Sequence, residues 1–247
     1  MNPQLELFVL PWGVYPRRIL LYLALKGLDS SEALKITPVT VVNTGMHAPG
    51  KPAGTVPILK LPDGTFIKQS VAILDYLEDV CDRPDETKDW QVKLSKAAAG
   101  NSSMRGSTPE ERARIREMLG LADEATSHFG FACHKGTALF VPLEPTHAFT
   151  AKLVLDNCRK TLKLLEGYYD EESSRKGDGS FSIADCVLFS LLQFAKELYG
   201  KDLTIEPELQ AIRRFYTSFE ARLDNNTKVP FYPEQIKALA QQWLPVE

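Results

Sequence analysis

The first 80 residues alternate short apolar segments with helical ones, and this order limits the fold more than any other feature of the chain. Leu5–Leu10 has the character of a buried strand, and Pro16–Lys26 is apolar at helical spacing. Proline suits the first position of a helix, and Gly27 is a common helix end. The next strand-like segment ends in the β-branched run Val39–Val42. A helix between two strands predicts a βαβ unit with parallel strands.

A predicted hairpin and a second helix complete this region. Residues 43–54 are rich in Gly and Pro and predict a loop. Val56–Lys60 and Thr65–Lys68 are short apolar runs on either side of Asp63-Gly64, a dipeptide typical of hairpin turns. Helical spacing then extends over Gln69–Leu77. The order is β-α-β followed by β-β-α.

The remainder of the chain has a different character. Residues 1–81 predict a small α/β domain, whereas residues 82–107 are polar and turn-rich and predict a linker with a loose insertion. From Pro109 the chain is helical in pattern almost to its end, and Ser182–Asp185 resembles a capping box with Asp in place of Glu. Residues 108–247 therefore predict an all-helical domain.

Composition and charge narrow the classes of partner. The net charge is −3, which gives no reason to expect nucleic acid or an anionic membrane. No apolar run reaches the roughly 18 residues that span a bilayer, and the first residues do not resemble a signal peptide. We therefore expect a cytoplasmic protein with neither membrane nor nucleic acid as its partner.

The cysteines carry no motif of their own. Their spacing makes neither a CxxC pair nor a metal site, and each lies in or beside an apolar segment. We expect free, mostly buried thiols without a catalytic role, and no metal. The four are Cys81, Cys133, Cys158 and Cys186.

The dipeptide Val56-Pro57 is the most informative feature for function. Proline at the entry to a strand removes one hydrogen bond of the sheet, so it belongs at an edge or a turn. A cis bond would let the Val56 backbone present its N–H and C=O to an extended, peptide-like ligand. The sequence favours equally an ordinary trans proline at the start of a strand.

Gln69-Ser70 follows a predicted strand and opens a predicted helix. The unpaired N–H groups and partial positive charge of a helix N-terminus bind carboxylates well. Ser70 and Gln69 would suit an α-carboxylate and its neighbouring amine. The more frequent interpretation is a serine that only caps its own helix.

Taken together and at this spacing, these segments resemble the cytosolic glutathione transferases. The resemblance is carried by the helix that ends at Gly27, by Gly54–Leu59, by Gln69–Glu78 and by the box at Ser182, and it covers nearly the whole chain. Pro11–Arg18 is most similar to the atypical fungal class of the family. The resemblance implies a thioredoxin-like glutathione-binding domain and a helical domain that forms the electrophile pocket. It also implies glutathione as co-substrate, a homodimer and a role in detoxification.

The resemblance assigns residues to the parts of glutathione. The Val56 backbone would pair with the cysteinyl unit, with Pro57 cis, and Gln69 and Ser70 would hold the γ-glutamyl carboxylate and amine. His47 matches a position near the glycyl carboxylate, although the loop that follows it is shorter than is usual. Residue 55 is a Thr where many members carry Lys or Gln, so the side chain of Thr55 contributes less.

The largest departure from the family concerns the thiol. Most members place Ser, Cys or Tyr at a position that falls here on Gly13, which has no side chain. A free thiol with a pKa near 8.5 is mostly protonated at neutral pH. The N–H groups of Val14 and Tyr15, at the start of a helix, would favour the thiolate, and the Tyr15 hydroxyl is a second candidate donor.

The resemblance extends to the second domain. In the similar atypical class, residues on the first helices of that domain help to hold a water near the sulfur. The matching region contains Ser127, His128 and His134.

The sequence thus predicts a glutathione transferase that conjugates the glutathione thiolate to a small hydrophobic electrophile, with the thiolate stabilised mainly by a helix N-terminus. Two alternatives stay open. Gly13 favours a non-catalytic glutathione-binding or scaffold protein of the same fold. A glutathione-dependent isomerase or dehalogenase is the other.

Overall fold

The computed structural model describes residues 5–42, 45–98, 102–175, 180–224, 227 and 230–246. The chain divides into two compact units, the first comprising Met1–Arg105 with Asn225–Pro230 and the second Gly106–Asp224 with Phe231–Glu247.

The first unit contains a four-stranded mixed sheet in the order β2-β1-β5-β6. Strand β1 (Leu5–Val9) pairs in parallel with β2 (Leu34–Pro38), and α1 (Val14–Lys26) connects the two. On its other side β1 pairs antiparallel with β5 (Ile58–Lys60), which forms a hairpin with β6 (Phe66–Ile67). The βαβ unit and the hairpin are confirmed, as is the thioredoxin-like fold class.

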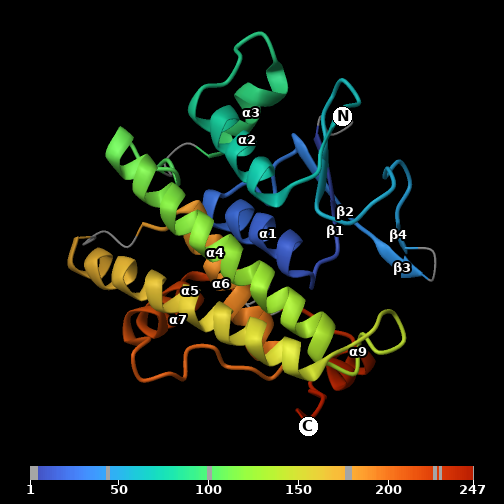
Figure 1. The fold of residues 1–247 in the computed structure, drawn as a ribbon. Coiled ribbons are helices and arrows are strands. Elements are labelled where there is room, and N and C mark those ends of the chain that lie inside the picture. Colours follow the sequence, from blue (N-terminus) through green and yellow to red (C-terminus); the bar gives the residue numbers. More distant parts are fainter. Residues whose placement is uncertain are drawn as a thin grey trace. The chain divides into compact units, whose positions relative to one another are not determined.

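The second strand of the βαβ unit lies earlier than predicted. The partner of β1 is Leu34–Pro38, and the β-branched run that follows, β3 (Thr40–Val42), pairs instead with β4 (Gly45–His47). Strand β4 lies within the predicted loop, of which residues 43 and 44 are outside the described residues. The β-branched pattern indicated strand character correctly but did not show which partner the segment has. All three residues of β3 are exposed, and the hairpin projects away from α1 and α2 (Figure 1).

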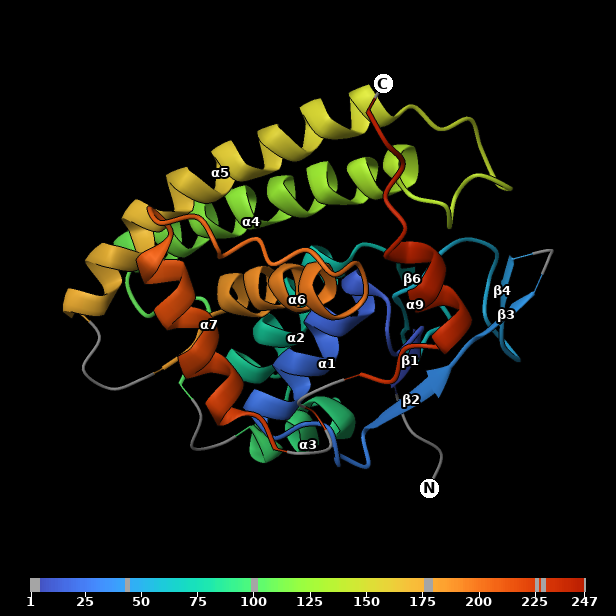
Figure 2. The same ribbon diagram turned by 90° about the horizontal axis from the view of Figure 1, so that it is seen from below.

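Helices α1 and α2 (Ser70–Asp82) lie side by side on one side of the sheet (Figures 1 and 2). Helix α1 begins at Val14, so Pro16 is its third residue and not its first. Proline is tolerated there because the third N–H of a helix has no partner within the helix. The predicted helix end is confirmed, since Gly27 has a left-handed φ of 72°.

The segment predicted as a loose linker is in part helical. Helix α3 (Asp89–Ala97) lies within it and packs against α2. The prediction rested on the turn-rich ends of the segment, whereas Trp90 and Leu94 of its central part are buried.

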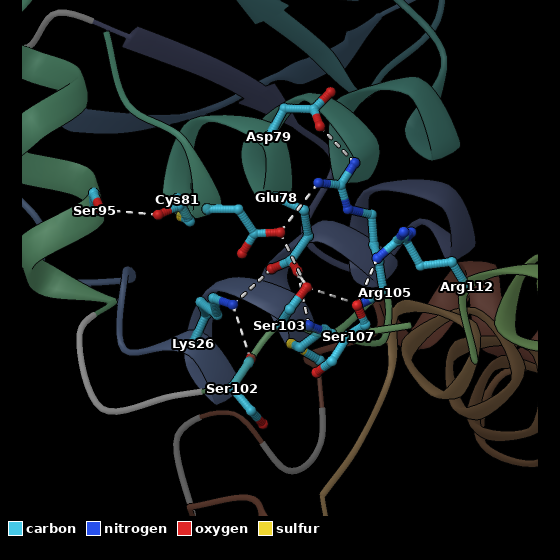
Figure 3. A network of polar contacts seen from close by, with 12 residues as sticks. Lys26, Glu78, Asp79, Cys81, Ser95, Ser102, Ser103, Arg105, Ser107 and Arg112 are labelled. Carbon is cyan, nitrogen blue, oxygen red and sulfur yellow. Dashed lines mark hydrogen bonds and ion pairs between the residues drawn. The ribbon is translucent and has the colours of Figure 1, made fainter. Parts of the chain in front are cut away.

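Residues 102–105 are held by a buried ion pair (Figure 3). The Glu78 carboxylate is fully buried on α2, 2.8 Å from the Lys26 ammonium, and it accepts a hydrogen bond from the Met104 N–H at 2.7 Å. Arg105 forms an ion pair with Asp79 at 2.6 Å. A buried carboxylate requires such partners, so the network fixes this part of the chain against α1 and α2.

The second unit is helical, as predicted. Its core lies around α6, most of whose side chains are buried. The long helices α4 and α5 pack along each other, α6 packs on α4, and α7 packs on α5 (Figure 2). No helix in the described part of the chain has the length and apolar character needed to cross a membrane. The helices are α4 (Pro109–Gly136), α5 (Ala148–Arg175), α6 (Ile183–Glu197), α7 (Gln210–Arg222) and α9 (Glu234–Ala240).

Candidate functional site

Strand directions bring the predicted site segments of the first unit to one edge of its sheet. Strand β5 runs antiparallel to β1, so its start lies at the edge where β1 ends. Strand β6 runs antiparallel to β5, so its end lies at this same edge. The segments that follow β1, precede β5 and follow β6 therefore converge. They carry Gly13, Val56 and Ser70, respectively.

The N-terminus of α1 is open. Gly13 is the N-cap residue, no side chain caps the helix, and its first turn holds no acidic residue. The N–H groups of Val14 and Tyr15 have no partner within the helix, and Pro16 has no N–H. A Cβ at Gly13 would lie 3.3 Å from both the Leu10 carbonyl oxygen and the Pro16 ring, so a side chain at this position would crowd the turn.

The Val56-Pro57 peptide bond is cis, which confirms the first interpretation and excludes the ordinary trans proline. Strand β5 begins only at Ile58. Within the part of the chain that the structure describes, the Val56 backbone makes no hydrogen bond to another backbone group. Both of its polar groups are therefore left for a ligand.

A hollow of about 530 Å³ is lined by residues 45–48 and 51–55, the last of which directly precedes Val56 in the chain. Its lining includes His47 and Thr55, so the structure brings these two predicted residues together. It also includes Lys51, whose ammonium donates to the carbonyl oxygens of Pro52 at 3.0 Å and Gly54 at 2.6 Å. Burial, together with the nearby Lys68, lowers the pKa of Lys51. Nothing in the sequence pointed to this lysine, because a single cation in a loop is usually solvated.

The N-terminus of α2 is also open. Gln69 is the N-cap residue and its side chain forms no capping hydrogen bond, whereas Ser70 is the first residue of the helix. The interpretation of Ser70 as a plain cap is therefore wrong. The Ser70 side chain is buried, and its Oγ accepts a hydrogen bond from Arg18 Nη1 at 3.1 Å. The first turn of α2 holds no acidic residue.

Arg18 is a residue of this region that sequence reasoning missed. It is fully buried on α1, and its guanidinium lies 4.6 Å from the centre of the Tyr15 ring. Arg18 thus contacts one residue at the start of α1 and one at the start of α2. The available signal was a pair of arginines directly before the apolar stretch of a helix predicted to be buried.

The cysteines are free. Burial raises the pKa of the Cys81 thiol to about 11 and that of Cys158 to about 12. Burial also raises the pKa of Cys133, and Cys186 is fully buried. Raised thiol pKa values and burial both oppose reaction at neutral pH.

The second-unit candidates Ser127, His128 and His134 all lie on α4. Ser127 is exposed and His128 is half-buried, and the buried Nδ1 of His128 has no hydrogen-bond partner among the described residues. His134 Nδ1 lies 2.5 Å from a Glu144 carboxylate oxygen, and its ring stacks on Phe140. The pairing of His134 with Glu144 occupies one of its two ring nitrogens. A contribution of these residues to the sulfur site stays a prediction.

Known proteins are similar both to the first unit and to the whole chain. Residues 12–80 match the family described as glutathione S-transferase, N-terminal domain. The chain is 28% identical to Glutathione S-transferase 2 of Saccharomyces cerevisiae in an alignment of 240 positions, which covers 90% of this chain and 88% of the yeast protein.

Solved structures show the same similarity. Gtt2 from Saccharomyces cerevisiae has a TM-score of 0.58 and 25% identity, with 88% of this chain and 96% of the yeast chain covered. A glutathione transferase family member from Pseudomonas fluorescens Pf-5, solved with bound glutathione, has a TM-score of 0.69 and 19% identity. That comparison covers 92% of this chain and 100% of the bacterial one. The resemblance inferred from the sequence is therefore confirmed: residues 12–80 match the glutathione S-transferase N-terminal domain, and the whole chain is similar to a yeast glutathione transferase.

Proposed function

We propose that the protein binds glutathione at the edge of the sheet in its first unit, as co-substrate of a transferase. The observation that carries this proposal is the convergence there of the unpaired Val56 backbone and two uncapped helix N-termini. An extended tripeptide with two carboxylates needs such groups, namely backbone partners for its middle residue and donors for its anionic ends. The glutathione bound to the bacterial relative supports the same assignment.

In this proposal each residue keeps the role that the resemblance implies. Val56 pairs with the cysteinyl unit, Gln69 and Ser70 hold the γ-glutamyl end, and the hollow lined by His47 and Thr55 receives the glycyl end. The Lys51 side chain places a further donor in that hollow.

The proposed reaction is attack of the glutathione thiolate on a small hydrophobic electrophile. The thiol proton leaves to solvent, the sulfur forms a bond to an electrophilic carbon, and a leaving group departs with its electron pair. The N–H groups of Val14 and Tyr15 stabilise the anionic sulfur, because a helix N-terminus carries partial positive charge. The helical second unit supplies the pocket for the electrophile. We further propose that the protein acts as a cytoplasmic homodimer in detoxification.

The second candidate is a protein that binds glutathione without catalysis, and the specific observation in its favour is Gly13. No side chain at this position can donate to the sulfur. A glutathione-dependent isomerase or dehalogenase would use the same thiolate and differs only in the electrophile.

Two measurements separate these functions. Calorimetric titration should show that the unmodified protein binds glutathione, and the absence of any binding would remove every candidate at once. A panel of alkyl halides, aryl halides and activated alkenes then tests for turnover. Binding without turnover of any member would favour the non-catalytic protein.

A further inference from the structure

Arg18 is a fully buried arginine on α1 whose side chain reaches the first turn of α2. We propose that Arg18 is a positioning residue, which turns the Ser70 hydroxyl into a hydrogen-bond donor for the γ-glutamyl carboxylate of glutathione. This inference rests on the proposed function and adds to it a residue that the resemblance does not assign.

The hydrogen bond between Arg18 and Ser70 can have only one direction. A guanidinium has only N–H donors, so at 3.1 Å Ser70 Oγ must be the acceptor. A serine hydroxyl has one proton and two lone pairs. The contact with Arg18 occupies a lone pair and leaves the proton available for donation. Among the described residues no side chain or backbone oxygen accepts this proton.

Ser70 is only 5% exposed, so bulk water has little access to its hydroxyl proton. The neighbouring polar groups are the first N–H groups of α2, which have no partner within the helix and no capping side chain. The Ser70 hydroxyl proton and these N–H groups are all donors, and a buried guanidinium lies behind them. Such a set fits a carboxylate and not an amine.

The Arg18 guanidinium has contacts on two sides. On one side it donates to Ser70 Oγ, and on another the Tyr15 ring lies over it with 4.6 Å between the guanidinium carbon and the ring centre. Contact with an aromatic face favours a cation and restricts its rotamers. Tyr15 therefore holds Arg18, and Arg18 holds Ser70. A substitution of Arg18 should therefore weaken binding of the carboxylate, although Arg18 itself does not contact the ligand.

The experiment compares two ligands on each protein, because a purely structural defect would weaken both alike. The ligands are glutathione and its analogue in which the γ-glutamyl α-carboxylate is a carboxamide. Calorimetry gives the ratio of the two dissociation constants. For the unmodified protein we expect glutathione to bind at least about tenfold more tightly, the discrimination typical of a hydrogen bond to a charged group. In Arg18→Met this ratio should fall to about threefold or less.

Arg17→Met is the matched control. Arg17 is the neighbouring residue of the same helix, is 6% exposed, and donates to the Thr227 carbonyl and not to Ser70. Its replacement should leave the ratio unchanged. If Arg18→Met does not fold, as judged by circular dichroism, Arg18→Gln serves instead, because it removes the charge with a polar side chain. Its ratio should fall by at least about threefold.

A double-mutant cycle completes the test. If Arg18 acts through Ser70, Arg18→Met in a Ser70→Ala background should change the ratio by less than about twofold. The proposal is overturned if the Arg18 variants keep the ratio of the unmodified protein. It is also overturned if the effects of the two substitutions on the ratio multiply in the double variant. Failure of the unmodified protein to bind glutathione would instead remove the proposed function, so the two failures are distinguishable.

Discussion

Helices α4 to α7 of the second unit begin with N–H groups that bind to side chains of the protein, whereas α1 and α2 of the first unit begin without such a cap. Thr108 and Glu111 form a capping box at α4, and Ser182 and Asp185 form another at α6. The Glu166 carboxylate accepts two N–H groups at the start of α7, at 2.6 and 3.0 Å.

The remaining helices also differ from α1 and α2. His147 Nδ1 accepts the Thr150 N–H in the first turn of α5 at 3.1 Å. Helices α3 and α9 have no side-chain cap, but each carries an acidic residue in its first turn, Asp89 and Glu234 respectively. Among the helices of the described residues, α1 and α2 alone have neither device. A cap uses the donors of a helix for stability, and its omission reserves them for a ligand.

Removal of the cap of α6 should give the largest effect, and the effect should be on stability. The Asp185 carboxylate accepts from the Ser182 N–H at 2.6 Å and from the Tyr169 hydroxyl at 2.6 Å, and all three side chains are buried. Asp185→Ala should lower the free energy of unfolding by roughly 2–5 kcal/mol, because it leaves buried donors without acceptors. Urea unfolding measures this value.

Asp185→Asn is the control, since it keeps an acceptor oxygen in a side chain of the same shape and should cost less. The glutathione dissociation constant of either folded variant should be unchanged. A loss below 1 kcal/mol in Asp185→Ala would contradict the structural role of this cap.

Ser70→Ala should give the next largest effect, and here it should be on binding. Loss of a contact to a charged group should weaken glutathione binding by about 1.5–3 kcal/mol. Arg18 Nη1 also loses its acceptor, so a stability cost of about 1–3 kcal/mol accompanies it. Titration of the folded variant gives the first value.

Thr108→Ala is the matched change at a capped terminus. It should lower stability by about 0.5–2 kcal/mol and leave glutathione binding unchanged. If Ser70→Ala and Thr108→Ala had equal effects on the glutathione dissociation constant, the proposed difference between capped and uncapped helix N-termini would be contradicted.

The smallest effect is expected for the protein's own thiols, because in the proposed reaction the reacting sulfur belongs to the ligand. Cys81 is the one cysteine that is not fully buried, and its thiol pKa is raised to about 11. At pH 8 its thiolate fraction is therefore about a thousandth, and alkylation by iodoacetamide should be roughly two orders of magnitude slower than for free cysteine. The rate should rise about tenfold per pH unit towards that pKa. Loss of turnover upon brief alkylation at pH 8 would show that a cysteine takes part.

The sequence predicted the elements whose signals are local. The turn at Asp63-Gly64, the helix end at Gly27 and the capping box at Ser182 each depend on a few neighbouring residues, and all three are found. The strand partner predicted for Val39–Val42 was wrong, because a β-branched run indicates a strand but does not indicate which strand it pairs with.

What the sequence missed depends on contacts between distant residues. Arg18 and Ser70 are 52 positions apart, and Lys26 and Glu78 form their buried ion pair over a similar separation. In the sequence each of these four residues occupies an ordinary position of a predicted amphipathic helix. Only the packing of α1 against α2 shows that they meet.

The pKa of the bound glutathione thiol tests most directly the claim that the open start of α1 replaces a side-chain donor at Gly13. A helix end supplies typically 0.3–1 kcal/mol and up to about 2 when partly buried, so we expect a depression of about one unit, or about 1.4 kcal/mol. Tyr15→Phe keeps the ring against Arg18 and removes only the hydroxyl. The thiolate absorbance of bound glutathione, followed against pH in both proteins, should show a depressed pKa in each, with a rate loss below about tenfold in the variant. A bound thiol that returns to its free-solution pKa in Tyr15→Phe would contradict the account, because the hydroxyl would then be the activator.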